Sequence, residues 1–183
     1  MSPFKQAVRR GLIFGTIGAT IAFVGSLIAS KNKAEAEIAS APTQLVARGA
    51  APAWKLKDVD GKEISSEQFK GKVVVVDFWA TWCGPCLQEI PGYIALQKKY
   101  GDDLAIIGVS MDQAGPSVVK AYMAKAGVNY QIVMGDDAIV EAFGGMTAIP
   151  TTFLIDRTGQ IRDRKEGAMH TEDYEKRIVA VLK

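Results

Sequence analysis

The chain has 183 residues, of which 48% are hydrophobic, and 22 Lys and Arg against 20 Asp and Glu give it a net charge of +2. This length suits one domain of ordinary size with an appendage, and no basic stripe interleaved with aromatic residues indicates a nucleic-acid-binding surface. The two cysteines, Cys83 and Cys86, are too close in the chain to cross-link distant parts of a fold, which excludes a secreted disulfide scaffold.

Residues 1–30 contain a stretch without charge, Gly11 to Ser30. A helix of that length spans roughly 30 Å, which is the thickness of a bilayer's hydrocarbon core. Three cations precede the stretch and two follow it, a distribution that favours an inside N-terminus. We therefore predict a retained, single-pass anchor in the cytoplasmic membrane that leaves the rest of the chain on the extracytoplasmic, periplasmic side.

Two other interpretations of this segment stay open. Ala34-Glu35-Ala36 and Ala39-Ser40-Ala41 have the small-x-small pattern of signal-peptide cleavage, which would release a secreted protein. Arg9-Arg10 ahead of an apolar segment also occurs in twin-arginine export signals. Residues 31–50 mix Ala, Ser, charge and Pro without periodicity and are interpreted as a tether, so we place the domain at residues 51–183.

The domain opens with a predicted hairpin, in which Trp54 to Val59 and Glu63 to Ile64 flank the turn pair Asp60-Gly61. Ser65, with a Gln three positions later, then predicts a one-turn helix that the Ser side chain caps. Beyond this opening, apolar runs alternate with segments of helical periodicity.

Val73 to Trp79, which reads VVVVDFW, predicts a strand buried on both faces. A predicted helix from about Gly84 to Tyr100 follows it, and Pro91 inside that helix must bend it. The later segments are predicted as strands at 104–111 and 130–134, helices at 116–126 and 137–143, a hairpin of strands at 151–156 and 161–166, and a last helix capped by Thr171. This rhythm predicts an α/β fold with parallel strands and right-handed crossovers. The charges of Arg162 to Lys165 are interpreted as solvated.

Cys83 and Cys86 lie where the first buried strand turns into a helix. Free backbone N–H groups and the positive end of the helix dipole favour a thiolate there, so Cys83 is the predicted nucleophile. The four ligands of a structural zinc site are lacking, and the pair is interpreted as a redox pair. Cysteines three positions apart at a helix start come close enough for a disulfide, so Cys83 would attack a partner's disulfide and Cys86 would resolve the mixed disulfide.

Trp82-Cys83-Gly84-Pro85-Cys86, with Asp77-Phe78-Trp79-Ala80 before it, resembles the active site of the thioredoxin family. Pro91 matches that family's helix-kinking proline, and Ile149-Pro150-Thr151 is similar to the loop whose cis-proline faces the disulfide. The resemblance implies a thioredoxin fold, with a central mixed sheet flanked by helices. It also implies that Ile149–Pro150 is cis, that Ile149 and Trp82 bind the substrate chain, and that Gly84, Pro85 and Pro150 shape the site.

Asp77 resembles the family's buried aspartate, which accepts or relays a proton when the second cysteine attacks. Apolar residues flank Asp77 on both sides, which predicts that its carboxyl is buried. A buried carboxylate without a partner has a raised pKa, and a raised pKa suits a proton acceptor.

The opening hairpin, the strand and helix inserted between Met111 and Ile149, and the N-terminal anchor resemble the membrane-tethered thioredoxin-like proteins of the TlpA and ResA type. That type implies a thiol:disulfide oxidoreductase without a cofactor, which reduces disulfides of exported proteins, including apocytochrome c, and receives electrons from a membrane thiol donor. In that type an uncharged residue often replaces Asp77 and an acid of the inserted segment serves instead, so Glu141 stays an alternative.

Two rival functions share features with this chain. The opening hairpin is similar to that of thiol peroxidases of the peroxiredoxin kind, but those carry Thr three positions before the reactive cysteine, where this chain has Ala80. Copper chaperones of the Sco kind use two cysteines and a histidine, which would be His170 here, but their cysteines have three residues between them instead of two. We therefore expect no metal.

Overall fold

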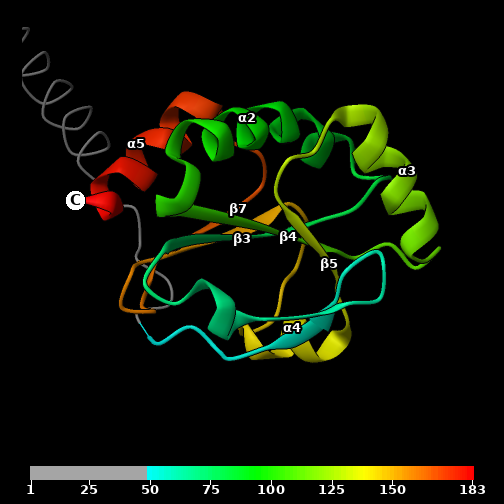
Figure 1. Ribbon diagram of the computed structural model, residues 1–183, viewed down its shortest axis with the longest axis horizontal. Coiled ribbons are helices and arrows are strands. Elements are labelled where there is room, and N and C mark those ends of the chain that lie inside the picture. Colours follow the sequence, from blue (N-terminus) through cyan, green and yellow to red (C-terminus); the bar gives the residue numbers. More distant parts are fainter. Residues whose placement is uncertain (1–48) are drawn as a thin grey trace, which may run out of the picture. The chain divides into compact units, whose positions relative to one another are not determined.

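The computed structural model describes residues 49–183 (Figure 1). The predicted anchor and most of the predicted tether lie outside the described residues. Within residues 49–183, no helix is both long enough and apolar enough to cross a membrane. The description below therefore concerns the predicted domain.

A short antiparallel hairpin, β1 (Lys55–Lys57) and β2 (Glu63–Ser65), opens the domain as predicted. Asp58 Oδ1 accepts hydrogen bonds from the N–H groups of Asp60 and Lys62, each at 2.9 Å, and these bonds close the turn. The 3₁₀ helix η1 (Ser66–Phe69) follows, but the predicted cap is wrong. Ser65 makes no side-chain cap, because it is still paired in the ladder of β2, and the Ser66 hydroxyl accepts from Trp54 N instead.

The central sheet has five strands in the order β5-β4-β3-β6-β7. Its strands are β3 (Val73–Trp79), β4 (Leu104–Ser110), β5 (Gln131–Met134), β6 (Thr151–Ile155) and β7 (Ile161–Glu166). β3, β4 and β5 run parallel, whereas β6 is antiparallel to β3 and β7 is antiparallel to β6. Every residue of β3 and β4 is buried, because helices and loops cover both faces. The predicted mixed α/β sheet of thioredoxin type is confirmed.

Helices cover both faces of this sheet (Figure 1). They are α2 (Gly84–Tyr100), α3 (Pro116–Ala126), α4 (Asp137–Ala142) and α5 (Thr171–Leu182), with a 3₁₀ turn, η2 (Gly101–Asp103), after α2. α2 and α5 lie over one face, and α4 lies over the other. The cap predicted at the start of α5 is wrong: Thr171 is the first helical residue, and His170 stands at the capping position without a side-chain bond. Glu172 and Asp173 in the first turn compensate, because anionic side chains stabilise a helix N-terminus.

The alternation of side chains along β3 divides the core into two clusters. Val73, Val75 and Trp79 belong to the cluster beneath α2 and α5, whereas Val74, Val76 and Phe78 belong to the cluster on the other face. Asp77 is therefore placed by the strand period on the α2 face, at a position where an apolar residue would be expected. β3 thus directs one carboxyl group toward the helix that begins with the cysteines.

Candidate active site

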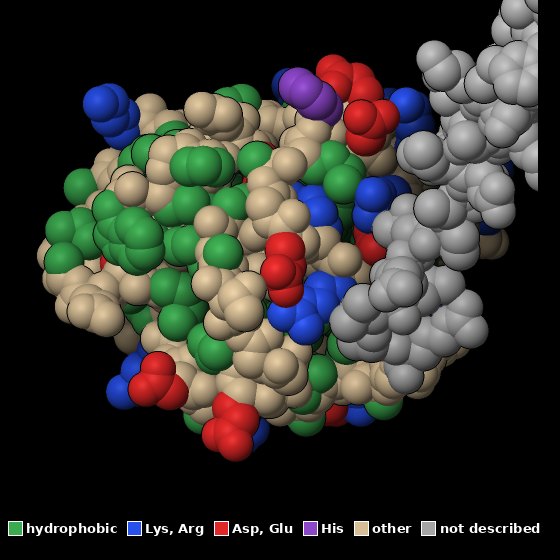
Figure 2. All heavy atoms as spheres, turned by 180° about the vertical axis from the view of Figure 1, so that it is seen from behind, with side chains coloured by type: hydrophobic (Ala, Val, Ile, Leu, Met, Phe, Trp, Pro, Cys, Tyr) green, Lys and Arg blue, Asp and Glu red, His purple; other side chains and the backbone are tan. Residues whose placement is uncertain are grey.

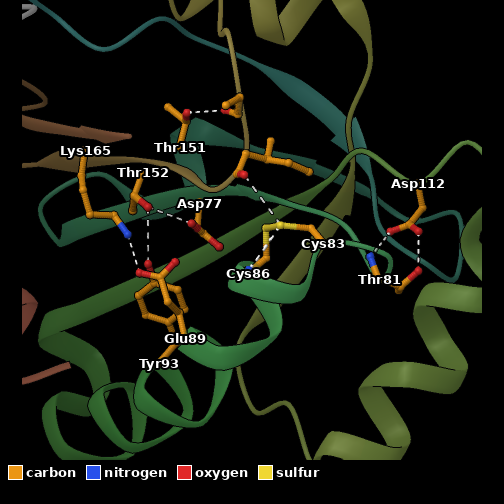
Figure 3. Close-up of a disulfide and its surroundings, with 12 residues drawn as sticks. Asp77, Thr81, Cys83, Cys86, Glu89, Tyr93, Asp112, Thr151, Thr152 and Lys165 are labelled. Atoms are coloured by element: carbon orange, nitrogen blue, oxygen red, sulfur yellow. Dashed lines mark hydrogen bonds and ion pairs between the residues drawn. A yellow bond between two sulfur atoms is a disulfide. The ribbon is translucent and has the colours of Figure 1, made fainter. Parts of the chain in front are cut away.

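The turn from β3 into α2 places Cys83 at the N-terminus of α2 (Figure 3). Cys83 is the N-cap residue, and Cys86 N lies 3.3 Å from Cys83 Sγ and donates to it. Pro85 stands in the first helical turn, where the missing N–H of a proline costs nothing. A thiolate at Cys83 would thus face the free amides and the positive end of the helix dipole, as the sequence predicts.

The two cysteines form a disulfide, with an S–S distance of 2.00 Å and a Cα–Cα distance of 5.3 Å. Cys83 is 6% exposed and Cys86 is 1% exposed. Both residues are buried, and Cys83 is the more exposed of the two. This arrangement fits the predicted division between an attacking and a resolving cysteine.

The loop before β6 approaches Cys83 from a distant part of the sequence. Its Ile149–Pro150 bond is cis, as the resemblance implies, and Ile149 O lies 3.7 Å from Cys83 Sγ. An oxidised sulfur carries no proton, so this is a contact in the disulfide form, and a Cys83 thiol could donate to the same oxygen after reduction. Thr151 Oγ1 donates to Ala148 O at 2.7 Å and holds the loop in place.

Asp77 is 3% exposed, and its Oδ1 accepts a hydrogen bond from Thr152 Oγ1 (Figure 3). Burial raises the pKa of Asp77 to about 7, with a further contribution from the negative charge of Glu89. The predicted direction of the shift is confirmed, but the carboxyl is not without a partner, since the Thr152 hydroxyl and the cation of Lys165 lower the pKa and limit the rise. At neutral pH, Asp77 can therefore both take up and release a proton.

Glu89 and Lys165 form a buried ion pair that the sequence analysis missed. Their side chains are 6% and 4% exposed, and Glu89 Oε1 also accepts from Met169 N at 3.0 Å. The interpretation of Lys165 as solvated is wrong, because α2 and α5 cover the end of β7. Glu89 carried a signal that helical periodicity could have detected: it lies three residues after Cys86 and four before Tyr93, on the buried face of α2.

Asp112, two residues after the end of β4, is a second missed residue. Its carboxylate accepts from Thr81 N at 2.9 Å, from Thr81 Oγ1 at 2.5 Å and from Ser110 Oγ at 2.8 Å (Figure 3). Thr81 lies two residues before Cys83, so Asp112 fixes the turn that presents the nucleophile. The signal was topological, because carboxyl ends of neighbouring parallel strands meet at one edge of a sheet.

The other residues that the sequence singled out differ in their exposure and in their position relative to the cysteines. Trp82 is 69% exposed beside the cysteines, whereas Trp79 is buried and packs against Tyr122. Figure 2 shows hydrophobic side chains gathered on one side of the surface, with charges of both signs elsewhere. Glu141 is exposed on α4, across the sheet from Asp77, and His170 is exposed at the start of α5. Within residues 49–183, no three His, Cys, Asp or Glu side chains are grouped to hold a metal.

Comparison with known proteins gives one consistent result. Residues 47–164 match the model of the AhpC/TSA family. By sequence, the chain is 35% identical to the thioredoxin-like protein YneN of Bacillus subtilis, over 70% of this chain and 76% of that protein. It is 32% identical to the thiol-disulfide oxidoreductase ResA of Geobacillus kaustophilus, over 76% of this chain and 80% of ResA. By structure, it is similar to a thiol:disulfide interchange protein from Chlorobium tepidum, with a TM-score of 0.69 and 33% identity over 75% of this chain and 99% of that one.

Proposed function

Because the chain belongs to the AhpC/TSA family and is a thiol-disulfide oxidoreductase with a thioredoxin fold, we propose that it reduces disulfide bonds in exported proteins. The observation that carries this proposal is the Cys83–Cys86 disulfide at the start of α2, with Cys83, the more exposed of the two residues, facing Ile149 O of the cis-proline loop. The helix start supplies the electrostatics for a thiolate, and the loop supplies a backbone edge beside the sulfur.

In the reduced protein, the Cys83 thiolate attacks one sulfur of a partner's disulfide. A Cys83–partner bond forms, and the partner's other sulfur leaves as a thiolate that takes up a proton. The Cys86 thiol then loses its proton, and its thiolate attacks Cys83 Sγ. The Cys83–Cys86 bond forms, the mixed disulfide breaks, and the partner is released with both sulfurs reduced while this protein is oxidised.

Asp77 is the proposed acceptor for the proton of Cys86. Its carboxyl lies on the α2 face of β3, and a pKa of about 7 lets it be half ionised at neutral pH. Glu141, the alternative acid, is exposed across the sheet and has no such placement. The substrate chain would lie along Ile149, whose carbonyl faces Cys83, and against the exposed ring of Trp82.

We place this reaction outside the cytoplasmic membrane, with residues 11–30 as the anchor and residues 31–50 as the tether. The support is the uncharged stretch with its flanking cations and the resemblance to tethered proteins of the ResA type. Apocytochrome c, before haem attachment, is the proposed substrate by that resemblance. A membrane thiol donor must then recycle the cysteines, because an extracytoplasmic reductant would otherwise act only once.

The test is a trapping experiment in cells with the full chain. Cys86→Ala removes the resolving thiol, so partners should accumulate as disulfides on Cys83 and be identified by mass spectrometry. Cys83→Ala, with Cys86 intact, is the matched control and should trap none. Trapping through Cys86 alone would reverse the assigned roles, and exclusively cytoplasmic partners would contradict the proposed location.

Assays on the purified protein distinguish the proposed function from that of a thiol peroxidase. Reduced wild-type protein should reduce insulin disulfides and should consume hydrogen peroxide no faster than Cys83→Ala. Rapid peroxide consumption that depends on Cys83, without insulin reduction, would overturn the proposed function.

A further inference from the structure

Three side chains form a row across the sheet on the face that α2 and α5 cover. Asp77 of β3 is paired in register with Thr152 of β6, and Thr152 is paired with Lys165 of β7. Residues directly opposite each other on neighbouring strands project to the same face of a sheet. Lys165 is therefore two strands away from Asp77 and points to the same buried layer (Figure 3).

Glu89 of α2 contacts this row from the side of the helices. Its Oε1 is paired with Lys165 and accepts from Met169 N, whereas its Oε2 is buried without a hydrogen-bond partner. The ammonium group of Lys165 also lies 5.6 Å from the centre of the Tyr174 ring, which belongs to α5. The carboxyl groups of Asp77 and Glu89 and the ammonium group of Lys165 therefore lie in one buried layer.

Packing alone does not account for this arrangement. A buried ion pair pays a desolvation cost that its attraction often fails to exceed, and apolar side chains of similar size frequently stabilise a core better. Within residues 49–183, the ion-pair partner of Lys165 is Glu89, and the charges of both act on Asp77, the proposed proton acceptor. The cost of burying the pair points to a role in the chemistry of that acid.

We propose that Lys165 is a positioning residue for the exchange reaction: it binds the Glu89 side chain in an ion pair, so that Asp77 is left to exchange the proton of Cys86. This inference rests on the proposed function, since it assigns Lys165 a part in that reaction. The ammonium group of Lys165 pairs with the carboxylate of Glu89 and offsets its buried charge. Asp77 is held instead by the neutral hydroxyl of Thr152.

The groups that face Asp77 fit this division. Glu89 raises the pKa of Asp77 and Lys165 lowers it, and both act beside the larger effect of burial. The tyrosines around the layer stay neutral near pH 7, because burial raises their pKa values above 10: Tyr93 of α2, Tyr130 before β5 and Tyr174 of α5. Among the described residues, the charged side chains that shift the pKa of Asp77 are thus Glu89 and Lys165.

The test compares three variants of the full chain: Lys165→Met, Glu89→Gln and the double variant. Their readout is the pKa of the Asp77 carboxyl in the reduced protein, followed by ¹³C NMR and assigned with Asp77→Asn. Lys165→Met should raise that pKa by about one unit, and Glu89→Gln should lower it by about one unit, because a charge is removed in each. The double variant should fall between the two, since both charges are gone.

The pH profile of insulin reduction should shift with the pKa of Asp77. It should move toward alkaline pH in Lys165→Met and toward acidic pH in Glu89→Gln. One unit corresponds to a tenfold change in the ratio of ionised to protonated Asp77 at fixed pH. Lys176→Met removes an exposed cation that pairs with Asp173, and it should leave both readouts unchanged.

A merely structural role would give a different pattern. Both single variants would then lose stability and activity without opposite shifts of the Asp77 pKa, and that outcome overturns the inference. If Lys165→Met fails to fold, Glu89→Gln and the double variant still carry the test, because the pKa of Asp77 must be lower in Glu89→Gln than in the double variant. If wild type reduces no insulin while the pKa shifts appear, the proposed function fails and the charge relationship stands.

Discussion

Thr152 Oγ1 donates a 2.8 Å hydrogen bond to Asp77 Oδ1, although the two residues are 75 positions apart in the chain. The bond crosses the antiparallel pair β3–β6, where Asp77 and Thr152 are directly opposite each other. β6 therefore does two things at the site: its first residues follow the cis-proline loop that contacts Cys83, and its second residue holds the acid. Substrate contact and proton transfer are linked through one strand.

Thr152→Val tests this bond. The variant keeps the shape of the side chain but removes the donor, so the charged form of Asp77 loses stabilisation and the pKa should rise above about 7. We expect a rise of about one unit, seen as an alkaline shift in the pH profile of insulin reduction. Thr151→Val is the matched control, because the Thr151 hydroxyl donates to Ala148 O and not to Asp77. A shift of equal size in both variants would contradict the assignment.

Asp77→Asn should stabilise the oxidised protein at alkaline pH while it slows the exchange reaction. The pKa of Asp77 is raised by burial from 3.8 in the unfolded chain to about 7 in the folded one. Below pH 3.8 both states are protonated and the group costs nothing. Between pH 3.8 and 7 the unfolded state ionises first, so stability falls as pH rises, and above pH 7 the full cost of about 4 kcal/mol is present.

The measurement is urea unfolding of wild type and Asp77→Asn at pH 4 and pH 8. The free energy of unfolding should differ little between the two proteins at pH 4, and the variant should be more stable by up to about 4 kcal/mol at pH 8. An equal difference at both pH values would mean that Asp77 does not titrate between them, and the proton acceptor would have to be another group.

The sequence predicted the parts of the site that depend on local pattern. Four valines before Asp77 indicate a buried strand, the apolar spacing from Leu87 to Tyr100 indicates a helix, and Cys83 stands at their junction. The pairing of Asp77 with Thr152 was not predictable, because register between strands depends on the whole sheet. The sequence pattern predicts contacts within one segment, whereas contacts between distant segments can be identified only from the folded structure.

Lys165 shows why the remaining charges were misjudged. β7 reads IRDRKE, with charge at five of six positions, and such a strand is normally solvated on one face. Here α5 covers that face, and Glu89 of α2 offsets the buried ammonium group. The two wrong helix caps have a smaller cause: whether a Ser or Thr hydroxyl caps a helix depends on the exact residue where the helix begins, which pattern locates only within a few positions.

Asp112→Asn tests the support of the active-site turn. The carboxylate accepts three hydrogen bonds, two from Thr81 and one from Ser110, whereas an amide has a single acceptor oxygen and would leave a buried donor unpaired. We expect a loss of about 1–3 kcal/mol in the free energy of unfolding. We also expect faster alkylation of Cys83 in the reduced protein, because the turn before it would be less restrained. Asp102→Asn, which changes a fully exposed carboxylate, should alter neither quantity.

Trp82→Ser tests the proposed docking of substrate proteins. The side chain is 69% exposed, so its removal should leave the free energy of unfolding within about 0.5 kcal/mol of wild type. A tryptophan that is buried by a partner contributes about 2 kcal/mol or more to binding, which predicts a roughly thirtyfold or larger loss in kcat/KM for a protein disulfide. Reduction of a small disulfide such as oxidised glutathione should stay near wild type, because it does not cover the ring.

Val118→Ser is the matched control for Trp82→Ser, since Val118 is the other large hydrophobic side chain exposed within residues 49–183, at 38%, and it lies on α3. It should change neither activity. If both variants lose activity toward the protein disulfide equally, the effect comes from surface hydrophobicity in general. If Trp82→Ser loses activity toward the small disulfide as well, the ring acts on Cys83 itself and its role is in the chemistry instead of docking.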